Sequence, residues 1–428
     1  MAALEEAAAS TVVLEATVLK EALMRSAADM KSAKAGLMPA ETRVDVLEVA
    51  TLDNGTERAH IRGGGREGWV SIKFLGDRTR RKGPLFLKRE TSSGASFLRG
   101  FVGAGYRSDA STPLVVVLHG TGYNAGVWLP TMDELHDLSY ERNVGFEVIL
   151  LEWTGHGRSR RCPGSGVDDA RYDLATLARD DVYAVLDAMP KIAGRRTYAV
   201  AHSIGAQVVV HAELDRPGCF DGISTFEPMI MPRPPLAAVP KAAAGAKVEV
   251  SPFIKTTLRR KNGWASFEAA AAYFQSTALG VEWEAKALAG YLQHGVLEQP
   301  DGTYALAMDP ETEACVYLNS GAHGGPRAYG RLSEIECEFH AAAGARSTMS
   351  LTHGKVSFDR HIANMRKIAE AVANPLDGEL GKDVNGAYHG PLLVLDDANH
   401  NIIQEDAEWA ARFIDASLAR IAANLDKK

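Results

Sequence analysis

The chain has 428 residues, of which 46% are apolar and 24% charged, so long disordered stretches and collagen-like repeats are not expected. Its 47 basic and 54 acidic side chains give a net charge of −7, which argues against a dedicated nucleic-acid binder. The four cysteines show no CxxC spacing, which excludes a zinc knuckle or a disulfide framework. The length suits two or three domains, or one large α/β domain with an appendage.

The two ends of the sequence carry no targeting pattern. The start, MAALEEAAAS, is acidic and lacks a sustained apolar core, so no secretory signal is expected. No run of about 18 apolar residues suggests a membrane span. The chain ends Asp426-Lys427-Lys428, which is not a peroxisomal tripeptide, and we expect a cytoplasmic protein.

The N-terminal region contains two stretches that differ in composition. Residues 1–25 are rich in Ala, Leu and Glu, which favours helix, and residues 1–21 are expected to be helical or disordered. From Val44 the pattern alternates: RVDVLEVATL, the turn Asn54-Gly55, RAHIR and GWVSIKFL predict short strands. Such units predict a small barrel of about 50–60 residues.

Residues 22–76 resemble a bacterial-type SH3 module. The stretch ALMRSAADMKSAKAGLMPAETRVDVLEV matches the opening of that module, and REGWVSIKFL matches its Gly-Trp-Val closing strand. The resemblance implies an SH3-like β-barrel with a binding or spacing role, whose candidate partner is a peptide or a protein.

Residues 77–110 form a basic stretch that contains Arg78, Arg80, Arg81, Lys82, Lys88 and Arg89. Binding to a membrane surface or an anionic partner is one interpretation. A solvated linker with some strand is favoured, because runs of charge are usually exposed to solvent.

From Pro113 onward strand and helix patterns alternate. Strands are predicted at 114–118, 146–153, 197–203, 222–227, 346–351 and 391–396, and helices include 173–189 and 407–425. This alternation predicts an α/β fold with a mostly parallel sheet, built from residues 111–228 and 341–428. Residues 229–340 are mostly helical and long, which predicts an inserted helical cap.

The sharpest chemical pattern is Ala201-His202-Ser203-Ile204-Gly205-Ala206. A predicted strand ends at the serine and a helix starts at once, and the small neighbours allow a crowded turn. Such a turn exposes the hydroxyl of Ser203 as a nucleophile above the sheet edge. The alternative is a serine that only caps a structural helix.

Two other patterns support the nucleophile. His119-Gly120-Thr121-Gly122 follows the first buried strand, and the N–H groups of Thr121 and Ile204 are candidates for an oxyanion hole. His400 follows the last predicted strand, where the carboxyl edge of a parallel sheet places it within reach of Ser203 as a general base.

Residues from about 84 to 425 resemble the α/β-hydrolase fold. LHGTG, EWTGHGRS, AHSIGA and DANHNI stand in the order and spacing of that family. The resemblance implies that Ser203 and His400 are a nucleophile–base pair.

A carboxylate is needed to orient His400 and to stabilise its charged form. Glu227 is favoured, because it ends a strand in an apolar stretch where an unpartnered carboxylate is costly. Asp359 is the alternative acid, since it follows the strand predicted at 346–351, and Asp396 or Asp397 remain as further candidates.

FEPMI followed by a long cap resembles the fungal toxin-biosynthesis and peroxisomal-lipase branch of the family. In that branch the acid also follows the strand after the nucleophile, and substrates are often hydrophobic esters. We therefore expect a serine hydrolase that cleaves an ester or related acyl bond through an acyl-enzyme. An acyltransferase or ester cyclase with the same triad, and an inactive binding protein, remain alternatives.

The substrate pocket is expected near the serine and beneath the cap. Aromatic residues at helical spacing also pack commonly within a cap, which is the alternative. The candidates are His119, Gly120, Gly122, His202, Phe253, Trp264, Phe267, Tyr273, Phe274 and Trp283.

Other chemistries find little support in the sequence. Gly63-Gly64-Gly65 lacks the Lys-Ser/Thr of a phosphate-binding loop, and no HExxH or clustered ligand spacing indicates a metal, so no cofactor is expected. A serine nucleophile also argues against epoxide hydrolase and haloalkane dehalogenase chemistry, which uses a carboxylate.

Overall fold

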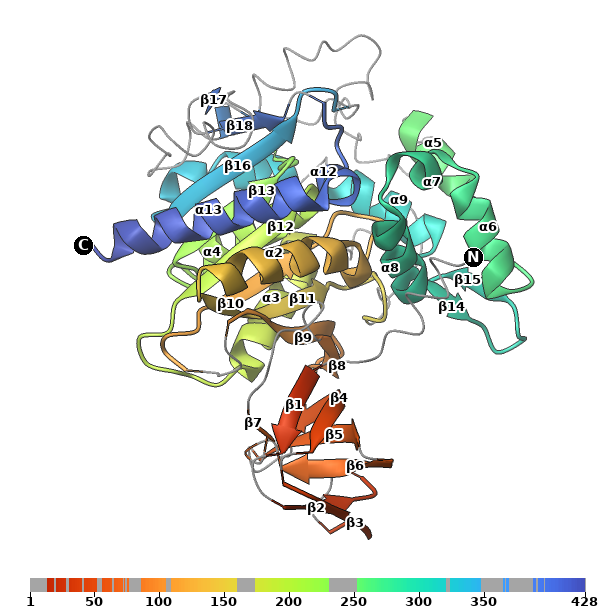
Figure 1. The fold of residues 1–428 in the computed structure, drawn as a ribbon. Helices are drawn as coiled ribbons and strands as arrows, with labels where there is room; N and C mark the ends of the chain where they lie inside the picture. Colours follow the sequence, from red (N-terminus) through yellow and green to blue (C-terminus); the bar gives the residue numbers. More distant parts are fainter. Residues whose placement is uncertain are drawn as a thin grey trace.

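The structure is a computed structural model, and Figure 1 shows its arrangement as a ribbon. The residues that it describes are 14–18, 21–27, 31–40, 42–51, 56–63, 65–71, 73, 75–76, 86–104, 109–159, 174–230, 252–320, 324–347, 365, 367–368, 388–389, 392–395 and 397–427.

A nine-stranded sheet organises the larger part of the molecule. Its order is β17-β18-β16-β13-β12-β10-β11-β9-β8, and within the described strands the run from β18 to β11 is parallel. The α/β prediction is therefore confirmed. The strand bounds are β8 (Phe86–Glu90), β9 (Ser96–Gly103), β10 (Leu114–Leu118), β11 (Gly145–Glu152), β12 (Thr197–His202), β13 (Gly222–Phe226), β16 (Glu338–Gly344), β17 (Tyr388–His389) and β18 (Leu392–Leu395).

One strand prediction is wrong at the residues that the structure describes. The strand expected at 346–351 is β16, Glu338–Gly344, with the sequence EFHAAAG, while Arg346 and Ser347 lie beyond its end and 348–351 fall outside the described residues. Alanine is a weak strand former, so propensity hides this strand. Close packing requires the glycine that ends the strand, since a Cβ on Gly344 would lie 2.4 Å from the carbonyl oxygen of Ala398.

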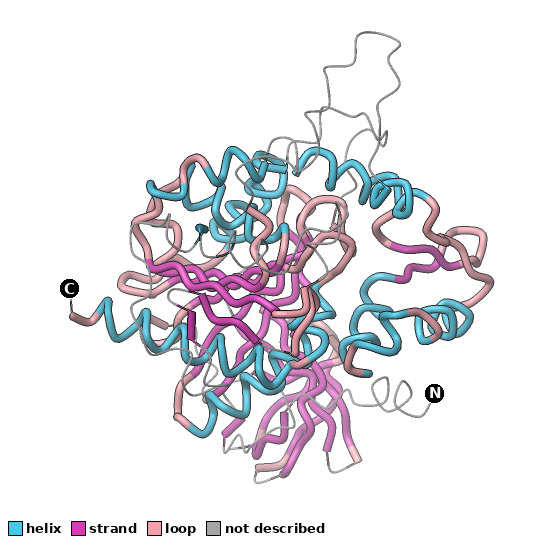
Figure 2. The backbone as a smooth tube through the Cα atoms, turned by 90° about the horizontal axis from the view of Figure 1, so that it is seen from above, coloured by secondary structure: helices cyan, strands magenta, loops and turns pink. Residues whose placement is uncertain are grey.

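Helices cover both faces of the sheet (Figure 2). The fully buried strand β10 shows the division, because Val116 and Leu118 join one apolar cluster and Val115 and Val117 join the other. The first cluster includes residues of α3 (Leu174–Ala188) and α4 (Ile204–Asp215), and the second includes residues of α2 (Leu129–Glu141) and α13 (Ala407–Leu425).

The N-terminal strands form a separate seven-stranded antiparallel sheet with its own small apolar core. The order is β3 (Lys34–Met38), β2 (Ala22–Arg25), β6 (Arg66–Ser71), β5 (Glu57–Gly63), β4 (Arg43–Thr51), β1 (Leu14–Val18) and β7 (Leu75–Gly76). The resemblance of this β module to SH3 domains stays a prediction.

The helical or disordered segment expected at residues 1–21 contains a strand where the structure describes it. Leu14–Val18 pairs with β4, so strand pairing overrides the local preference for helix there. Ala22–Arg25 pairs with β3 and lies within residues 22–76, where strands were predicted. Residues 1–13 lie outside the described part. Of the basic stretch, Lys88 and Arg89 lie in the edge strand β8, while Arg78, Arg80, Arg81 and Lys82 lie outside the described residues.

The described part of the predicted cap segment is mostly helical. One close contact joins it to the core: a Cβ on Gly126 of the 3-10 segment Ala125–Trp128 would lie 2.1 Å from the carbonyl oxygen of Gly290 in α8. The elements are α5 (Pro252–Leu258), α6 (Phe267–Gln275), α7 (Ala278–Glu282), α8 (Ala285–Gly295), β14 (Val296–Glu298), β15 (Tyr304–Leu306), α9 (Pro310–Asn319), α10 (Gly325–Tyr329) and the 3-10 turn Leu332–Glu334.

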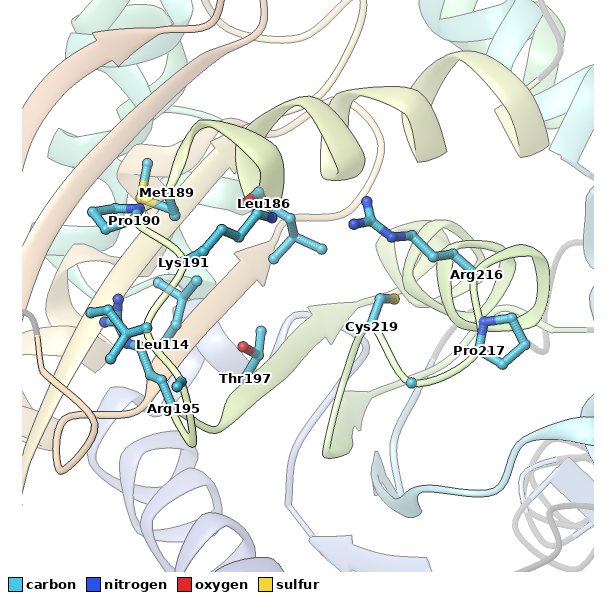
Figure 3. Close-up of a pocket in the computed structure, with 13 residues that line it drawn as sticks. Leu114, Leu186, Met189, Pro190, Lys191, Arg195, Thr197, Arg216, Pro217 and Cys219 are labelled. Carbon is cyan, nitrogen blue, oxygen red and sulfur yellow. Dashed lines mark hydrogen bonds between the residues drawn. The ribbon is translucent and has the colours of Figure 1, made fainter.

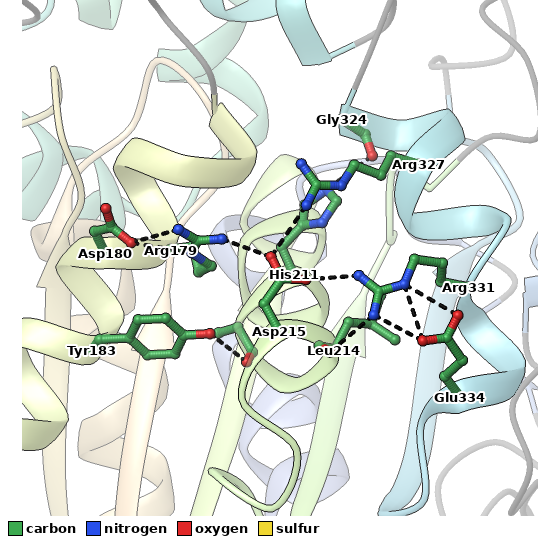
Figure 4. Close-up of polar contacts among 11 residues, drawn as sticks. Arg179, Asp180, Tyr183, His211, Leu214, Asp215, Gly324, Arg327, Arg331 and Glu334 are labelled. Atoms are coloured by element: carbon green, nitrogen blue, oxygen red, sulfur yellow. Dashed lines mark hydrogen bonds and ion pairs between the residues drawn. The ribbon is translucent and has the colours of Figure 1, made fainter.

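A cluster of ion pairs fastens the end of this segment to the sheet-covering helices (Figure 4). Asp215, which ends α4, accepts bonds from Arg179 at 2.6 Å, Arg331 at 2.7 Å and Arg327 at 3.3 Å. Its side chain is only 18% exposed. One carboxylate therefore joins α3, α4 and the chain on either side of Gly330.

Asp215→Asn is expected to lower the free energy of unfolding by about 1–3 kcal/mol, because three guanidinium groups lose their shared anion. Urea unfolding measures the effect. The matched control is Asp180→Asn, which removes an exposed partner of Arg179 and should change stability by less than about 0.5 kcal/mol. An Asp215→Asn protein as stable as the wild type would show that the ion pairs of Asp215 do not stabilise the fold.

The stabilisation by the ion pairs of Asp215 depends on pH. Burial would raise the pKa of Asp215, but the hydrogen bonds from Arg331 and Arg179 outweigh burial and hold it below its usual value. The stabilisation is thus complete above the pKa of the unfolded state and is lost as the pH falls through the lower folded-state pKa.

Candidate active site

Ser203 occupies the sharp turn between β12 and α4. Its backbone φ is 56° and ψ is −123°, a region that a residue with a side chain rarely adopts. Backbone bonds hold the turn, since the Ser203 N–H donates to Phe226 O at 2.9 Å and its carbonyl accepts from Met229 N at 3.2 Å. A Cβ on Gly205 would lie 2.6 Å from His119 O, so the turn needs a glycine there. The Ser203 side chain makes no capping bond to α4.

The structure brings Ser203, His400 and Glu227 together. His400 Nε2 lies 2.9 Å from Ser203 Oγ, and His400 Nδ1 lies 2.9 Å from Glu227 Oε2. Because a carboxylate only accepts, Nδ1 carries the proton and Nε2 is free to accept from the serine hydroxyl. Ser203 is 6% exposed, His400 8% and Glu227 not at all, so the three groups are buried.

Glu227 follows the last residue of β13 with a backbone φ of 50°. Its Oε1 accepts from the N–H of Gly344 at 2.7 Å, and its Oε2 accepts from Ser347 Oγ at 2.6 Å as well as from His400. These donors compensate for burial of the carboxylate. Sequence reasoning missed Gly344, because the strand that it ends was predicted eight residues too late, and Ser347, because it was assigned to that predicted strand.

Of the other predicted acids, the structure describes one. Asp359 and Asp396 lie outside the described part of the chain, and Asp397 is exposed.

The loop that starts at His119 packs directly against Ser203. A Cβ on Gly120 would lie 3.0 Å from Ser203 Cβ. The N–H of Gly122 donates to His156 Nε2 at 3.2 Å, and the N–H of Tyr123 donates to Gly120 O at 3.3 Å. The N–H of Thr121, and that of Ile204 at the start of α4, have no acceptor among the described residues.

Uncharged aromatic side chains hydrogen-bond to the backbone of this loop. Trp153 Nε1–H donates to His119 O at 3.1 Å, and His119 Nδ1 donates to Gly120 O at 2.8 Å. Burial lowers the pKa of His119 to about 4, and burial together with His119 lowers the pKa of His156. Both rings are therefore neutral at physiological pH. Sequence reasoning missed the contribution of His156, although the motif EWTGHGRS contains it.

The predicted aromatic pocket residues lie mainly in the interior of the cap. Trp264 packs against Tyr273 at 5.6 Å and Phe274 at 5.5 Å between ring centroids, and Phe267 meets Tyr304 edge-on. The side chain of Phe253 lies outside the described residues. Packing within the cap thus accounts for the burial of Trp264 and Phe274.

One tyrosine that was not predicted, Tyr123, contacts the residue before Ser203, and it also contacts the predicted Trp283. The ring of Tyr123 stacks on His202 at 6.0 Å and meets Trp283 edge-on at 5.3 Å and Tyr291 at 6.4 Å. Tyr123 directly follows the glycine turn in the sequence, which is the signal that would have identified it.

A groove of about 490 Å³ lies at the opposite edge of the sheet (Figure 3). Leu114 and Thr197, the first residues of β10 and β12, line it, together with Arg195, Arg216 and Cys219. Ser203 follows the other end of β12, about 20 Å along the strand. The groove is therefore separate from the site around Ser203.

Among the residues that the structure describes, no group of three or more His, Cys, Asp or Glu side chains is arranged to hold a metal ion. None of the helices in that same part of the chain combines the length and the apolar character needed to cross a bilayer.

Comparisons with known proteins agree with the fold. The sequence model of the Alpha/beta hydrolase family matches residues 115–413, so the chain belongs to this family. The peroxisomal α/β-hydrolase Lpx1 of Saccharomyces cerevisiae is similar in structure, with a TM-score of 0.59 and 14% identity over 80% of this chain and 91% of that protein. An esterase of Mycobacterium tuberculosis is also similar, with a TM-score of 0.51 and 15% identity over 80% of this chain and 93% of the esterase.

Identities this low establish the fold alone, and the predicted α/β-hydrolase fold is confirmed. No curated protein sequence matches the chain significantly.

Proposed function

We propose that this α/β hydrolase is a serine hydrolase that cleaves an ester or related acyl bond of a hydrophobic small molecule. The observation that carries the proposal is the position of His400, whose two ring nitrogens lie 2.9 Å from Ser203 Oγ and 2.9 Å from Glu227 Oε2. A nucleophile, a base and an orienting carboxylate in this order are the requirements for acyl transfer through a serine.

Ser203, His400 and Glu227 have different roles in the proposed reaction. His400 Nε2 removes the proton of Ser203 as Oγ attacks the substrate carbonyl, and Glu227 stabilises the imidazolium that forms. The imidazolium then protonates the leaving group, which departs as an alcohol and leaves an acyl-enzyme. His400 next removes a proton from water, which attacks the acyl carbon and releases the acid and Ser203.

The oxyanion is assigned to the N–H groups of Thr121 and Ile204. Both lack an acceptor among the described residues, whereas the neighbouring N–H groups of Gly122 and Tyr123 are already used. The Thr121 hydroxyl is also buried without a described partner, which suits a polar ligand at this loop. One such donor typically contributes about 10²–10³-fold to kcat.

A fluorophosphonate probe tests the proposal, because it reacts with serines that a base activates. We expect wild-type protein to be labelled at Ser203, and heat-denatured protein and Ser203→Ala to remain unlabelled. Folded wild type that stays unlabelled while a control hydrolase reacts would refute the enzyme and favour an inactive binding protein. Mass spectrometry of the labelled peptide identifies the residue.

For the N-terminal β module we propose a binding or spacing role, on its sequence resemblance alone.

A further inference from the structure

His202, the residue before the nucleophile, is directed at the backbone of the proposed base. Its ring is fully buried, and its Nε2 lies 2.8 Å from the carbonyl oxygen of His400, 198 positions away in the sequence. A carbonyl oxygen only accepts, so Nε2 carries the hydrogen and donates it. The second nitrogen, Nδ1, has no described partner and packs over Gly120, where a Cβ would lie 3.1 Å from it.

His400 lies in a segment between β18 and the short helix α12 (Ile402–Glu405), without a regular ladder of backbone bonds. Side chains supply its anchors instead. The His400 N–H donates to Asn399 Oδ1 at 2.8 Å, and the hydroxyl of Tyr123 donates to Asn401 Oδ1 at 2.6 Å. The rings of Tyr123 and His202 stack at 6.0 Å with an interplanar angle of 9°.

We propose that His202 is a positioning residue, which holds the carbonyl of His400 and thereby keeps the imidazole aimed at Ser203. This inference rests on the proposed serine hydrolase function. The hydrogen bond that His400 Nε2 accepts from the Ser203 hydroxyl is exchanged in turn for bonds to the leaving group and to water. The hydrogen bond from the His202 side chain to the His400 carbonyl takes part in no proton transfer, so it persists through every step.

The chemistry of an imidazole suits this task. The ring centroids of His202 and His400 are 5.0 Å apart, so a cation at position 202 would repel the imidazolium that forms on His400. Burial and the neighbouring His400 lower the pKa of His202 to about 3, and the ring therefore donates a hydrogen bond without carrying charge. A buried carbonyl left without that donor would be unsatisfied.

Two variants of His202 separate hydrogen bonding from ring volume. His202→Phe keeps a planar ring but has no donor, while His202→Gln keeps an N–H near the position of Nε2. With p-nitrophenyl esters as substrates, His202→Phe is expected to lower kcat by about 10–100-fold with KM unchanged to about twofold, because a small misplacement of the base affects the chemical steps. His202→Gln should recover kcat to within about fivefold of the wild type.

The control is His340→Phe, which removes another fully buried imidazole, bonded through Nδ1 to Ser417 Oγ at 2.6 Å on the far side of β13. It should lower Tm to a similar extent and leave kcat unchanged. A wild-type kcat for His202→Phe, equal losses in the Phe and Gln variants, or an equal loss in His340→Phe would each overturn the positioning role.

If His202→Phe does not fold, Tyr123→Phe provides the second measurement. It removes the bond to Asn401 in the same segment and is expected to lower kcat about threefold to tenfold without raising KM. An unchanged kcat would then count against the proposal. Inactive wild-type protein would refute the hydrolase function itself, whereas active wild type with unaffected variants refutes only the role of His202.

Discussion

Ser203→Ala is expected to lower kcat by at least about 10³-fold, because it removes the hydroxyl that we propose as the nucleophile. The methyl group of alanine is small and leaves the turn between β12 and α4 intact. Substrate binding should therefore persist, with KM close to that of the wild type. Steady-state hydrolysis of p-nitrophenyl esters of graded chain length measures both constants.

The matched control for this variant is Ser224→Ala. Ser224 is a buried serine on β13, hydrogen-bonded to Ser417 and without a role in the proposed chemistry. We expect its kcat to equal that of the wild type. If Ser203→Ala retained more than about a tenth of wild-type turnover, a different group would be the nucleophile.

Glu227→Gln is expected to lower kcat by about 10²–10⁴-fold. The two carboxylate oxygens accept from the Gly344 N–H, the Ser347 hydroxyl and the His400 Nδ1–H. A glutamine has one oxygen and one NH₂ group, so at least one donor would face another donor. The imidazole would lose its orientation, or would change its tautomer and present a proton to Ser203 instead of a lone pair.

The same kinetic assay compares this acid with its competitor. Asp359→Asn should leave kcat within about threefold of the wild type, because the buried carboxylate bonded to His400 is Glu227. Thermal unfolding of both variants controls for loss of fold. A larger loss for Asp359→Asn than for Glu227→Gln would overturn the assignment of the acid.

Local patterns were sufficient to predict much of the fold. The all-apolar run LVVVL coincides with β10, and the amphipathic segment at 407–425 coincides with α13. Both signals come from residues that are adjacent in the chain and share one environment, a doubly covered strand in one case and a half-buried helix in the other. Where the environment came from distant partners, as in β1 and the alanine-rich β16, propensity was misleading.

The sequence by itself determined the groups that we propose for the reaction: the serine in a crowded strand-to-helix turn, the glycine turn after β10 and the histidine after the last parallel strand. Each of these is a property of a few consecutive residues, so each can be recognised without coordinates. Only the tertiary structure decided which groups meet. Glu227 reaches His400 across 173 positions, and His202 reaches its carbonyl across 198. Hydrogen bonds depend on separations in space of about 3 Å, and adjacent parallel strands alone bring such remote residues to one edge of the sheet.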